Sequence, residues 1–136
     1  MAKRIIIIGD QKEELTSICK SLSELKYIAV TLNADSFTIT EFIALDPALA
    51  LIYVENLSEK EYDLLLGIRA NFFTNRVPVI LITNDPDIVK AFENDTKVFC
   101  LVKPFDQRKL IDQVNELLLA KIIPLYQIVG GGMFPV

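Results

Sequence analysis

The chain has 136 residues, of which 51% are hydrophobic and 24% are charged, a balance that fits one globular domain and excludes a disordered segment. Its 14 basic and 18 acidic residues give a net charge of −4 without a long basic run, which argues against nucleic-acid binding. The longest apolar runs, 5–8 and 49–54, are too short to cross a membrane, and the N-terminus lacks a signal peptide, so we expect a soluble cytoplasmic protein.

The sequence contains no histidine, which removes the usual general base and the usual zinc ligand. The chain therefore cannot be the donor in a histidine-to-aspartate phosphotransfer, although it could be the receiver. Cys19 and Cys100 stand alone in apolar stretches without a Cys-x-x-Cys spacing. This pattern favours buried free thiols over a disulfide or a metal site.

The first half of the chain predicts three strands and two helices. The strands are expected at 3–9, 27–32 and 48–54, where β-branched and other apolar residues form short continuous runs. A helix capped by Asp10 and ending near Lys26 is expected to bury residues at helical spacing: Leu15, Ile18, Cys19, Leu22 and Leu25. A second helix over 35–46 is expected to open at Asp35 or Ser36, to close before Pro47 and to bury Phe37 and Phe42.

In the second half of the chain, predicted helices and strands continue to alternate. A helix is expected from about Ser58 to Ala70, with Ser58 and Glu61 as a capping box. Strands are expected at 77–83 and 97–102, separated by a short helix that carries Ile88, Val89 and Phe92. The last helix is expected from about Asp106 to Lys121, with one apolar face formed by Leu110, Ile111, Val114, Leu117 and Leu118.

Five strands that alternate with five helices predict a doubly wound α/β domain, with a parallel sheet and helices on both faces. Such folds place function in the crevice at the carboxyl ends of the strands. The residues delivered there are Gly9 and Asp10, the segment 53–55, Thr83 with Asn84, and Lys103.

These positions resemble those of the CheY-like receiver domain of two-component response regulators. In that family the first strand ends in acidic residues, an acceptor Asp ends the third, Ser or Thr ends the fourth, and Lys-Pro follows the fifth. The resemblance covers about residues 3–122 and is most specific at VKPF (102–105) and PVILIT (78–83). It implies a flavodoxin-like fold with strand order 2-1-3-4-5, a receiver-like domain at 1–122 and, outside it, an apolar tail at 123–136.

The resemblance places Tyr53 at the acceptor position, because the spacing from Tyr53 to Arg69 matches the family without a gap. The family's paired acids read Gly9-Asp10 here, whereas Thr83 and Lys103 fit the family pattern. Tyrosine is a neutral phenol at pH 7 and a poor nucleophile toward a phosphodonor.

The same resemblance makes Gly9, Asp10, Glu55, Thr83 and Lys103 a vestigial pocket. In the family Mg²⁺ bridges the acceptor and the paired acids, but here only Asp10 and the backbone carbonyl of Glu55 could serve, so we expect at best weak metal binding by Asp10 and no cofactor. We hypothesise that Lys103 pairs with Asp10, and that the Tyr53 hydroxyl lies near one of them. The side chain of Glu55 is interpreted as a solvated loop carboxylate.

The resulting prediction is a degenerate pseudo-receiver without enzymatic activity, a phosphorylation-independent protein-interaction module in two-component signal transduction. Two alternatives remain. One is a functional phosphorelay receiver in which Asp10 is a displaced acceptor. The other is a flavodoxin-like domain that binds a small ligand, which is disfavoured because IIIIGD has a lone glycine without GxGxxG or a P-loop.

Signalling in the family couples the pocket to an aromatic residue three positions before the lysine, and so remodels the face of the fourth helix, fifth strand and fifth helix. Cys100 occupies that switch position here, and its small side chain cannot act as an aromatic lever. We therefore expect a protein partner at this face, independent of phosphate.

The tail after Ile122 has no charged side chain and contains GGG. It predicts docking on a neighbouring chain, as in a homodimer, docking on its own domain, or the remnant of a longer protein.

Overall fold

The computed structural model describes residues 2–9, 12–35 and 38–119 of the chain. The chain forms two compact units, Met1–Phe105 and Asp106–Val136. The first unit contains the whole sheet and four helices, and the second contains the last helix. Asp10, Phe37 and the tail at 123–136 lie outside the described residues, so the predictions made for them stay predictions.

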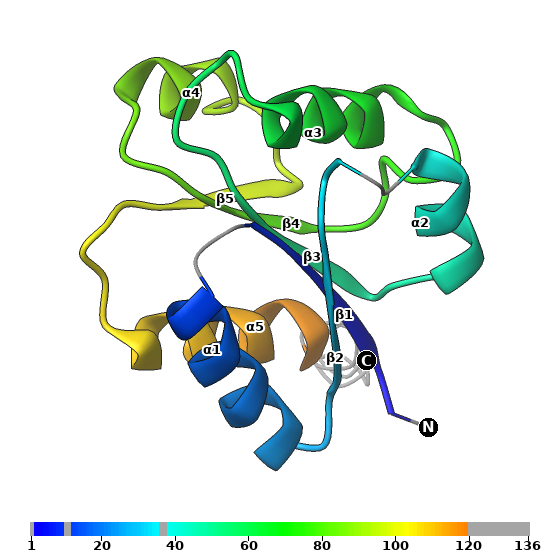
Figure 1. Cartoon of the computed structure of the whole chain (residues 1–136), viewed down its shortest axis with the longest axis vertical. Coiled ribbons are helices and arrows are strands. Elements are labelled where there is room, and N and C mark those ends of the chain that lie inside the picture. The colour runs from blue at the N-terminus through cyan, green and yellow to red at the C-terminus, as the bar shows by residue number, and fades with distance from the viewer. Residues whose placement is uncertain (1, 10–11, 36–37, 120–136) are drawn as a thin grey trace, which may run out of the picture. The chain divides into compact units, whose positions relative to one another are not determined.

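Five parallel strands form one sheet in the order β2-β1-β3-β4-β5 (Figure 1). They are β1 (Arg4–Ile8), β2 (Ile28–Leu32), β3 (Leu49–Tyr53), β4 (Val79–Ile82) and β5 (Val98–Leu101). The described residues also form five helices: α1 (Lys12–Glu24), α2 (Ile39–Leu45), α3 (Lys60–Ala70), α4 (Pro86–Ala91) and α5 (Gln107–Leu119). The doubly wound parallel sheet of strand order 2-1-3-4-5 is confirmed.

The two central strands are buried on both faces, as their continuous apolar runs predict. No residue of Ile5–Ile8 or Leu49–Tyr53 is more than 2% exposed. In Figure 1, α1 lies on one side of the sheet, and α2, α3 and α4 lie on the other. Because successive side chains of a strand point to opposite faces of the sheet, each strand contributes side chains to a core on either face.

One core joins alternate strand residues to the helices α2, α3 and α4. It contains Ile6, Ile8, Ala50, Ile52, Val79 and Leu81 from the strands and Phe42, Leu65, Ile68 and Ile88 from the helices. The buried residues of α1 are Leu15, Ile18 and Leu22. Each such side chain contributes roughly 2 kcal/mol through its removal from water.

The starts of two helices differ from the prediction. Helix α2 is capped by Thr38 and not by Asp35 or Ser36, because the Thr38 hydroxyl accepts a hydrogen bond from the Glu41 backbone and the Glu41 carboxylate accepts one from the Thr38 backbone. This reciprocal pair satisfies two backbone donors at once. Asp35 instead forms an exposed ion pair with Lys60.

The predicted capping box of Ser58 and Glu61 is also wrong. Helix α3 begins at Lys60 after the N-cap Glu59. The Ser58 hydroxyl is bound to the Asn56 side chain, and the Glu59 carboxylate reaches back to the backbone amides of Glu55 and Asn56. Side chains close in sequence therefore form these hydrogen bonds in place of the predicted bonds between Ser58 and Glu61.

Smaller differences concern the ends of elements. The strands are shorter than predicted by one or two residues at most ends, and α1 ends at Glu24, which leaves Leu25 43% exposed. Cys19 and Cys100 are free thiols as predicted, but they are half-buried. Burial raises the pKa of both thiols.

Helix α5 belongs to the second unit. It buries Leu110, Val114 and Leu118, whereas Ile111 and Leu117 are partly exposed. The buried face of α5 is therefore narrower than the predicted one. No helix in the described part of the chain has the length and apolar character needed to span a membrane.

Candidate functional site

The candidate pocket lies where strands β3, β4 and β5 end. Tyr53 is the last residue of β3 and is paired in register with Ile82, which directly precedes Thr83. Lys103 follows β5 by two residues, in the same unit. Because parallel strands end at one edge of the sheet, side chains far apart in the sequence meet here.

The side chain of Tyr53 fills the end of its strand and is tied to α1. It is 2% exposed, and its hydroxyl donates a hydrogen bond of 2.8 Å to Glu14 Oε1. Burial raises the pKa of Tyr53, and the hydrogen bond and negative charge of Glu14 raise it further. The phenol is therefore neutral at any physiological pH.

The ammonium group of Lys103 lies over the face of Tyr53. Its Nζ atom is 5.0 Å from the centroid of the Tyr53 ring, within the range of a cation–π contact, and 3.5 Å from Glu55 Oε1. The Glu55 side chain, which we interpreted as solvated, is 59% exposed but paired with Lys103. The predicted pairing of Lys103 with Asp10 lies outside the described residues.

Two polar side chains after β4 fix the neighbouring loops. The Thr83 side chain is buried, and its hydroxyl accepts a hydrogen bond of 3.1 Å from the backbone amide of Asp85. Asn84 Oδ1 accepts one of 2.8 Å from the backbone amide of Lys103. Asn84 thus joins the loop after β4 to the segment after β5.

A hollow of about 60 Å³ remains between these groups, lined by Val54, Glu55, Thr83, Asn84 and Lys103. It has room for a few water molecules. Three of the predicted pocket residues, Glu55, Thr83 and Lys103, therefore share one small cavity.

Gly9 borders a different hollow, of about 550 Å³, beside α1 and β2. Its described lining contains Leu15, Thr16, Cys19 and the strand end Thr31–Asn33, with no charged or aromatic side chain among them. The described residues thus do not bring Gly9 into the small cavity around Lys103. The predicted switch residue, Cys100, lies half-buried in β5.

Solved structures show which fold this is. The chain superposes on the signal receiver domain of a signal transduction histidine kinase from Syntrophus aciditrophicus with a TM-score of 0.71 and 24% identity, over 88% of this chain and 92% of that one. It superposes on the chemotaxis response regulator CheY4 of Vibrio cholerae with a TM-score of 0.73 and 13% identity, over 87% of this chain and 100% of that one. The fold is that of a CheY-like receiver domain.

A third receiver-fold neighbour, a response regulator from Burkholderia multivorans, is 17% identical with a TM-score of 0.67, over 86% of this chain and 95% of that one. No family model matches the chain, and no curated protein does.

Asp10, the side chain predicted to bind Mg²⁺ weakly, lies outside the described residues, so that prediction stays a prediction. Mg²⁺ prefers carboxylate and water oxygens in an octahedral arrangement. The end of β3 carries the phenol of Tyr53, and the Glu55 carboxylate pairs with Lys103. Among residues 2–9, 12–35 and 38–119, no group of three or more His, Cys, Asp or Glu side chains is placed to hold a metal ion.

The residue that sequence reasoning missed is Glu14. It lies in the first turn of α1, and its carboxylate accepts the hydrogen bond of the Tyr53 hydroxyl. A usable signal was present, since a helix that follows the first strand of such a sheet begins at the carboxyl edge. An acid in its first turn therefore falls close to the end of β3.

Proposed function

We propose that this chain is a receiver-like domain of a cytoplasmic two-component pathway that signals by binding a protein partner and is not itself phosphorylated. The main support is the residue at the end of β3. Tyr53 offers a hydroxyl that is held by Glu14 and a ring that is covered by Lys103. A phosphodonor reaching this strand end would meet no carboxylate nucleophile from β3.

The phenol itself is a poor substitute for the missing acceptor. A nucleophilic hydroxyl needs a neighbour that lowers its pKa or removes its proton. Glu14 accepts the hydroxyl hydrogen, but its negative charge raises the pKa of Tyr53 and so disfavours the phenolate. Phosphoryl transfer to Tyr53 is therefore opposed by burial and by charge together.

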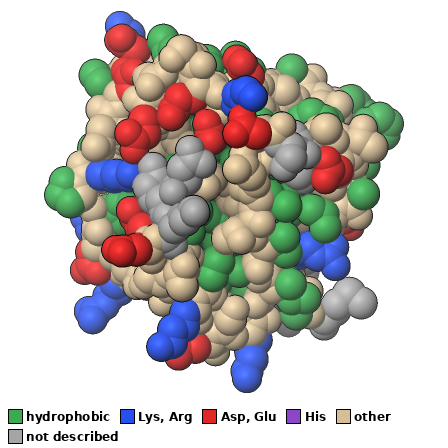
Figure 2. All heavy atoms as spheres, viewed as in Figure 1, with side chains coloured by type: hydrophobic (Ala, Val, Ile, Leu, Met, Phe, Trp, Pro, Cys, Tyr) green, Lys and Arg blue, Asp and Glu red, His purple; other side chains and the backbone are tan. Residues whose placement is uncertain are grey.

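The surface charge near this strand end also opposes phosphorylation. Figure 2 shows acidic side chains outnumbering basic ones in the upper left of the visible face, the direction in which β3 and β4 end in Figure 1. Asp85, Asp87 and Glu59 lie in or next to the loops at this edge. A negative surface repels an anionic phosphodonor such as acetyl phosphate.

Acetyl phosphate with Mg²⁺ tests the proposal directly. The purified chain and a phosphorylatable receiver domain, as positive control, are treated together and analysed by intact mass spectrometry. We expect a phosphoryl adduct on the control alone. An acid-stable or acid-labile adduct on this chain would overturn the proposal.

The same assay decides the alternative in which Asp10 is a displaced acceptor. If an adduct forms on the native chain and disappears in Asp10→Asn, the chain is a phosphorelay receiver. Loss of the adduct in Tyr53→Phe would instead assign it to the phenol.

We assign the partner to a surface that includes α4 and β5 of the first unit. Cys100 supports a phosphate-independent surface, because a half-buried thiol offers no large ring that could move between two positions. Val102, next to β5, is 54% exposed and offers an apolar contact for a partner.

The tail at 123–136 is proposed as a second contact, through which the chain forms a homodimer. Light scattering on the full chain and on a version ending at Lys121 tests it. An unchanged molecular mass per particle would exclude the tail as a dimer contact.

A flavodoxin-like ligand function has less support. The hollow beside α1 and β2 is large enough for a small ligand, but its described lining offers no aromatic ring to stack on a flavin. Titration of FMN against the protein, followed by flavin fluorescence, should show no saturable quenching.

A further inference from the structure

The side chains around Lys103 connect four elements that would otherwise end independently at the sheet edge. The Glu14–Tyr53 hydrogen bond joins α1 to β3, and the contact of Lys103 with the Tyr53 ring joins β3 to the segment after β5. The Asn84 side chain then joins that segment to the β4–α4 loop. The order of contacts is therefore α1, β3, the segment after β5, and the β4–α4 loop.

Further hydrogen bonds fix the loops that this chain of contacts reaches. Thr83 accepts from the Asp85 amide at 3.1 Å, and Asp85 accepts from the Asp87 amide at 2.9 Å, which caps α4. On the other side, the Glu59 carboxylate accepts from the amides of Glu55 and Asn56 in the β3–α3 loop. Both loops next to the cavity are thus held by side chains of their own.

We propose that Glu14, Tyr53, Lys103 and Asn84 form an internal latch, which holds the β4–α4 loop in one conformation without metal or phosphate. The inference rests on the proposed function and deepens it, because it names what sets the state of this pocket. Tyr53 and Asn84 act as positioning residues and bind no ligand.

The charge on Lys103 favours the contacts that make up the latch. The cation of Lys103 is shared between the Tyr53 ring and the Glu55 carboxylate, so the described cavity side chains need no external ion for balance. The side chain of Lys103 is 22% exposed, and a partly desolvated cation interacts more strongly with a ring than an exposed one. A side chain held in this way also holds its own backbone, whose amide is the donor to Asn84.

The latch makes a non-local prediction that separates it from a set of independent contacts. Tyr53→Phe removes only the hydroxyl and the bond to Glu14, and touches neither the Asn84–Lys103 bond nor the Thr83–Asp85 bond. If the contacts work together, the amides of Lys103 and Asp85 should nevertheless open more often. We expect their hydrogen exchange to become about fivefold faster, which corresponds to the loss of one hydrogen bond of about 1 kcal/mol.

Amide hydrogen exchange of the full chain, read by NMR without Mg²⁺ or phosphodonor, is the test. Tyr62→Phe is the matched control, because the Tyr62 ring packs edge-on against Phe92 and Tyr62 is not among the residues that line the cavity. Asn84→Ala removes the hydrogen bond to the Lys103 amide directly. Its control is Asn33→Ala, because Asn33 Oδ1 also accepts a hydrogen bond from a backbone amide in a loop at the same sheet edge. The effect of the double variant Tyr53→Phe with Asn84→Ala on exchange should be smaller, in free energy, than the sum of the two single effects.

Unchanged exchange at Lys103 and Asp85 in Tyr53→Phe, or equal acceleration in Tyr62→Phe, would overturn the latch. Neither result bears on whether the chain is phosphorylated. A phosphoryl adduct formed from acetyl phosphate would overturn the proposed function while leaving the exchange result as it stands, so the two failures are distinguishable.

Discussion

The Tyr53 hydroxyl donates a 2.8 Å hydrogen bond to Glu14 Oε1, and this bond joins the end of the third strand to the start of the first helix. Removing the hydroxyl in Tyr53→Phe should lower the free energy of unfolding by about 1 kcal/mol, the usual net value of such a bond. Urea denaturation measures it. Tyr62→Phe, as control, should change the stability by less than about half as much. Equal losses in the two variants would show that the bond to Glu14 contributes nothing specific.

The contact between Lys103 and the Tyr53 ring should be measurable as a coupling energy. In a double-mutant cycle of Lys103→Met and Tyr53→Leu, we expect a coupling of about 0.5 to 1 kcal/mol, as for a partly exposed cation–π pair. The exposed carboxylate of Glu55 should contribute less, so a cycle of Lys103→Met with Glu55→Gln should couple more weakly and should fall with added salt. A coupling that follows Glu55 and not Tyr53 would contradict this ranking.

The strands were predictable because each is a short apolar run and strands alternate with helical segments, whereas their order followed from the resemblance to receiver domains. The runs at 5–8 and 49–53 have no competing interpretation, and both are buried in the centre of the sheet. Helix starts were less predictable. Several residues with capping side chains lie close together before α2 and α3, and which of them caps depends on local hydrogen bonds such as the one from Glu41 to Thr38.

The candidate site was predictable only in part, for a physical reason. Strand ends are fixed by the fold, so Tyr53, Thr83 and Lys103 could be placed from sequence spacing. The bonds that Tyr53 and Lys103 form depend on side-chain directions across elements, which sequence spacing does not fix even where it places an acid such as Glu14 close to the end of β3. Glu14 was missed for this reason, and Glu55 is exposed, as interpreted from the sequence, but its pairing with Lys103 was not foreseen.

Gly67 in the middle of α3 offers a stabilising substitution. Glycine in a helix interior costs about 1 kcal/mol relative to alanine. A Cβ atom at this position would lie 3.4 Å from Ile39 Cδ1, which is ordinary van der Waals contact with α2. Gly67→Ala should therefore raise the free energy of unfolding by about 0.5 to 1 kcal/mol in urea denaturation. A loss of stability would mean that α2 and α3 cannot accommodate the methyl group.

A buried and an exposed phenylalanine should respond very differently to truncation to alanine. Phe42 is fully buried in the core, and Phe42→Ala should cost about 3 to 5 kcal/mol because it removes apolar burial and leaves a cavity. Phe72 is 83% exposed in the α3–β4 loop, so Phe72→Ala should change the stability by less than about 0.5 kcal/mol. Thermal unfolding of the two variants compares them. A comparable loss for Phe72 would show that its ring is buried in solution.

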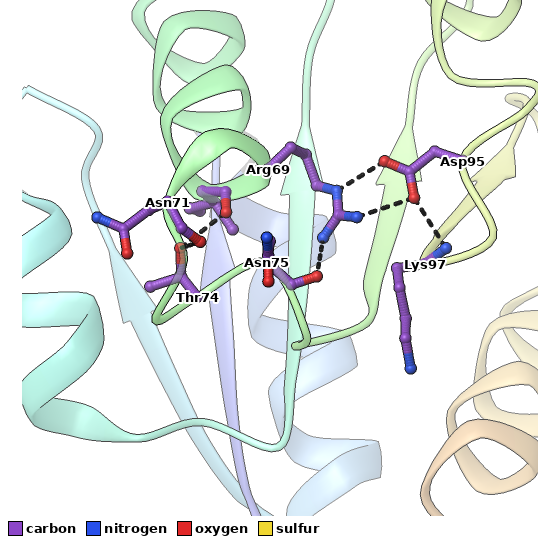
Figure 3. A network of polar contacts seen from close by, with 7 residues as sticks. Arg69, Asn71, Thr74, Asn75, Asp95 and Lys97 are labelled. Atoms are coloured by element: carbon purple, nitrogen blue, oxygen red, sulfur yellow. Dashed lines mark hydrogen bonds and ion pairs between the residues drawn. The ribbon is translucent and has the colours of Figure 1, made fainter.

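The ion pair of Arg69 with Asp95 should make the stability depend on pH. Arg69 Nε and Nη2 contact the two carboxylate oxygens of Asp95 at 2.8 and 2.9 Å, and Arg69 also donates to the Asn75 carbonyl, which fixes the α3–β4 loop (Figure 3). Partial burial raises the pKa of Asp95, but the hydrogen bonds from Arg69 and the Lys97 amide and the charge of Arg69 outweigh it, so the pKa is lowered.

Because the pKa of Asp95 is lower in the folded chain than in the unfolded one, its contribution is present above the unfolded value of about 4 and is lost as the pH falls through the folded value. At pH 6, Asp95→Asn should therefore be less stable than the native chain by about 1 to 2 kcal/mol. The difference should shrink as the pH falls from about 4, the unfolded pKa, to about 2, roughly two units below it. Asp35→Asn, which breaks the exposed pair with Lys60, should show little change at either pH. A difference for Asp95→Asn that stays constant down to the acid limit would mean that the carboxylate charge is not what stabilises this loop.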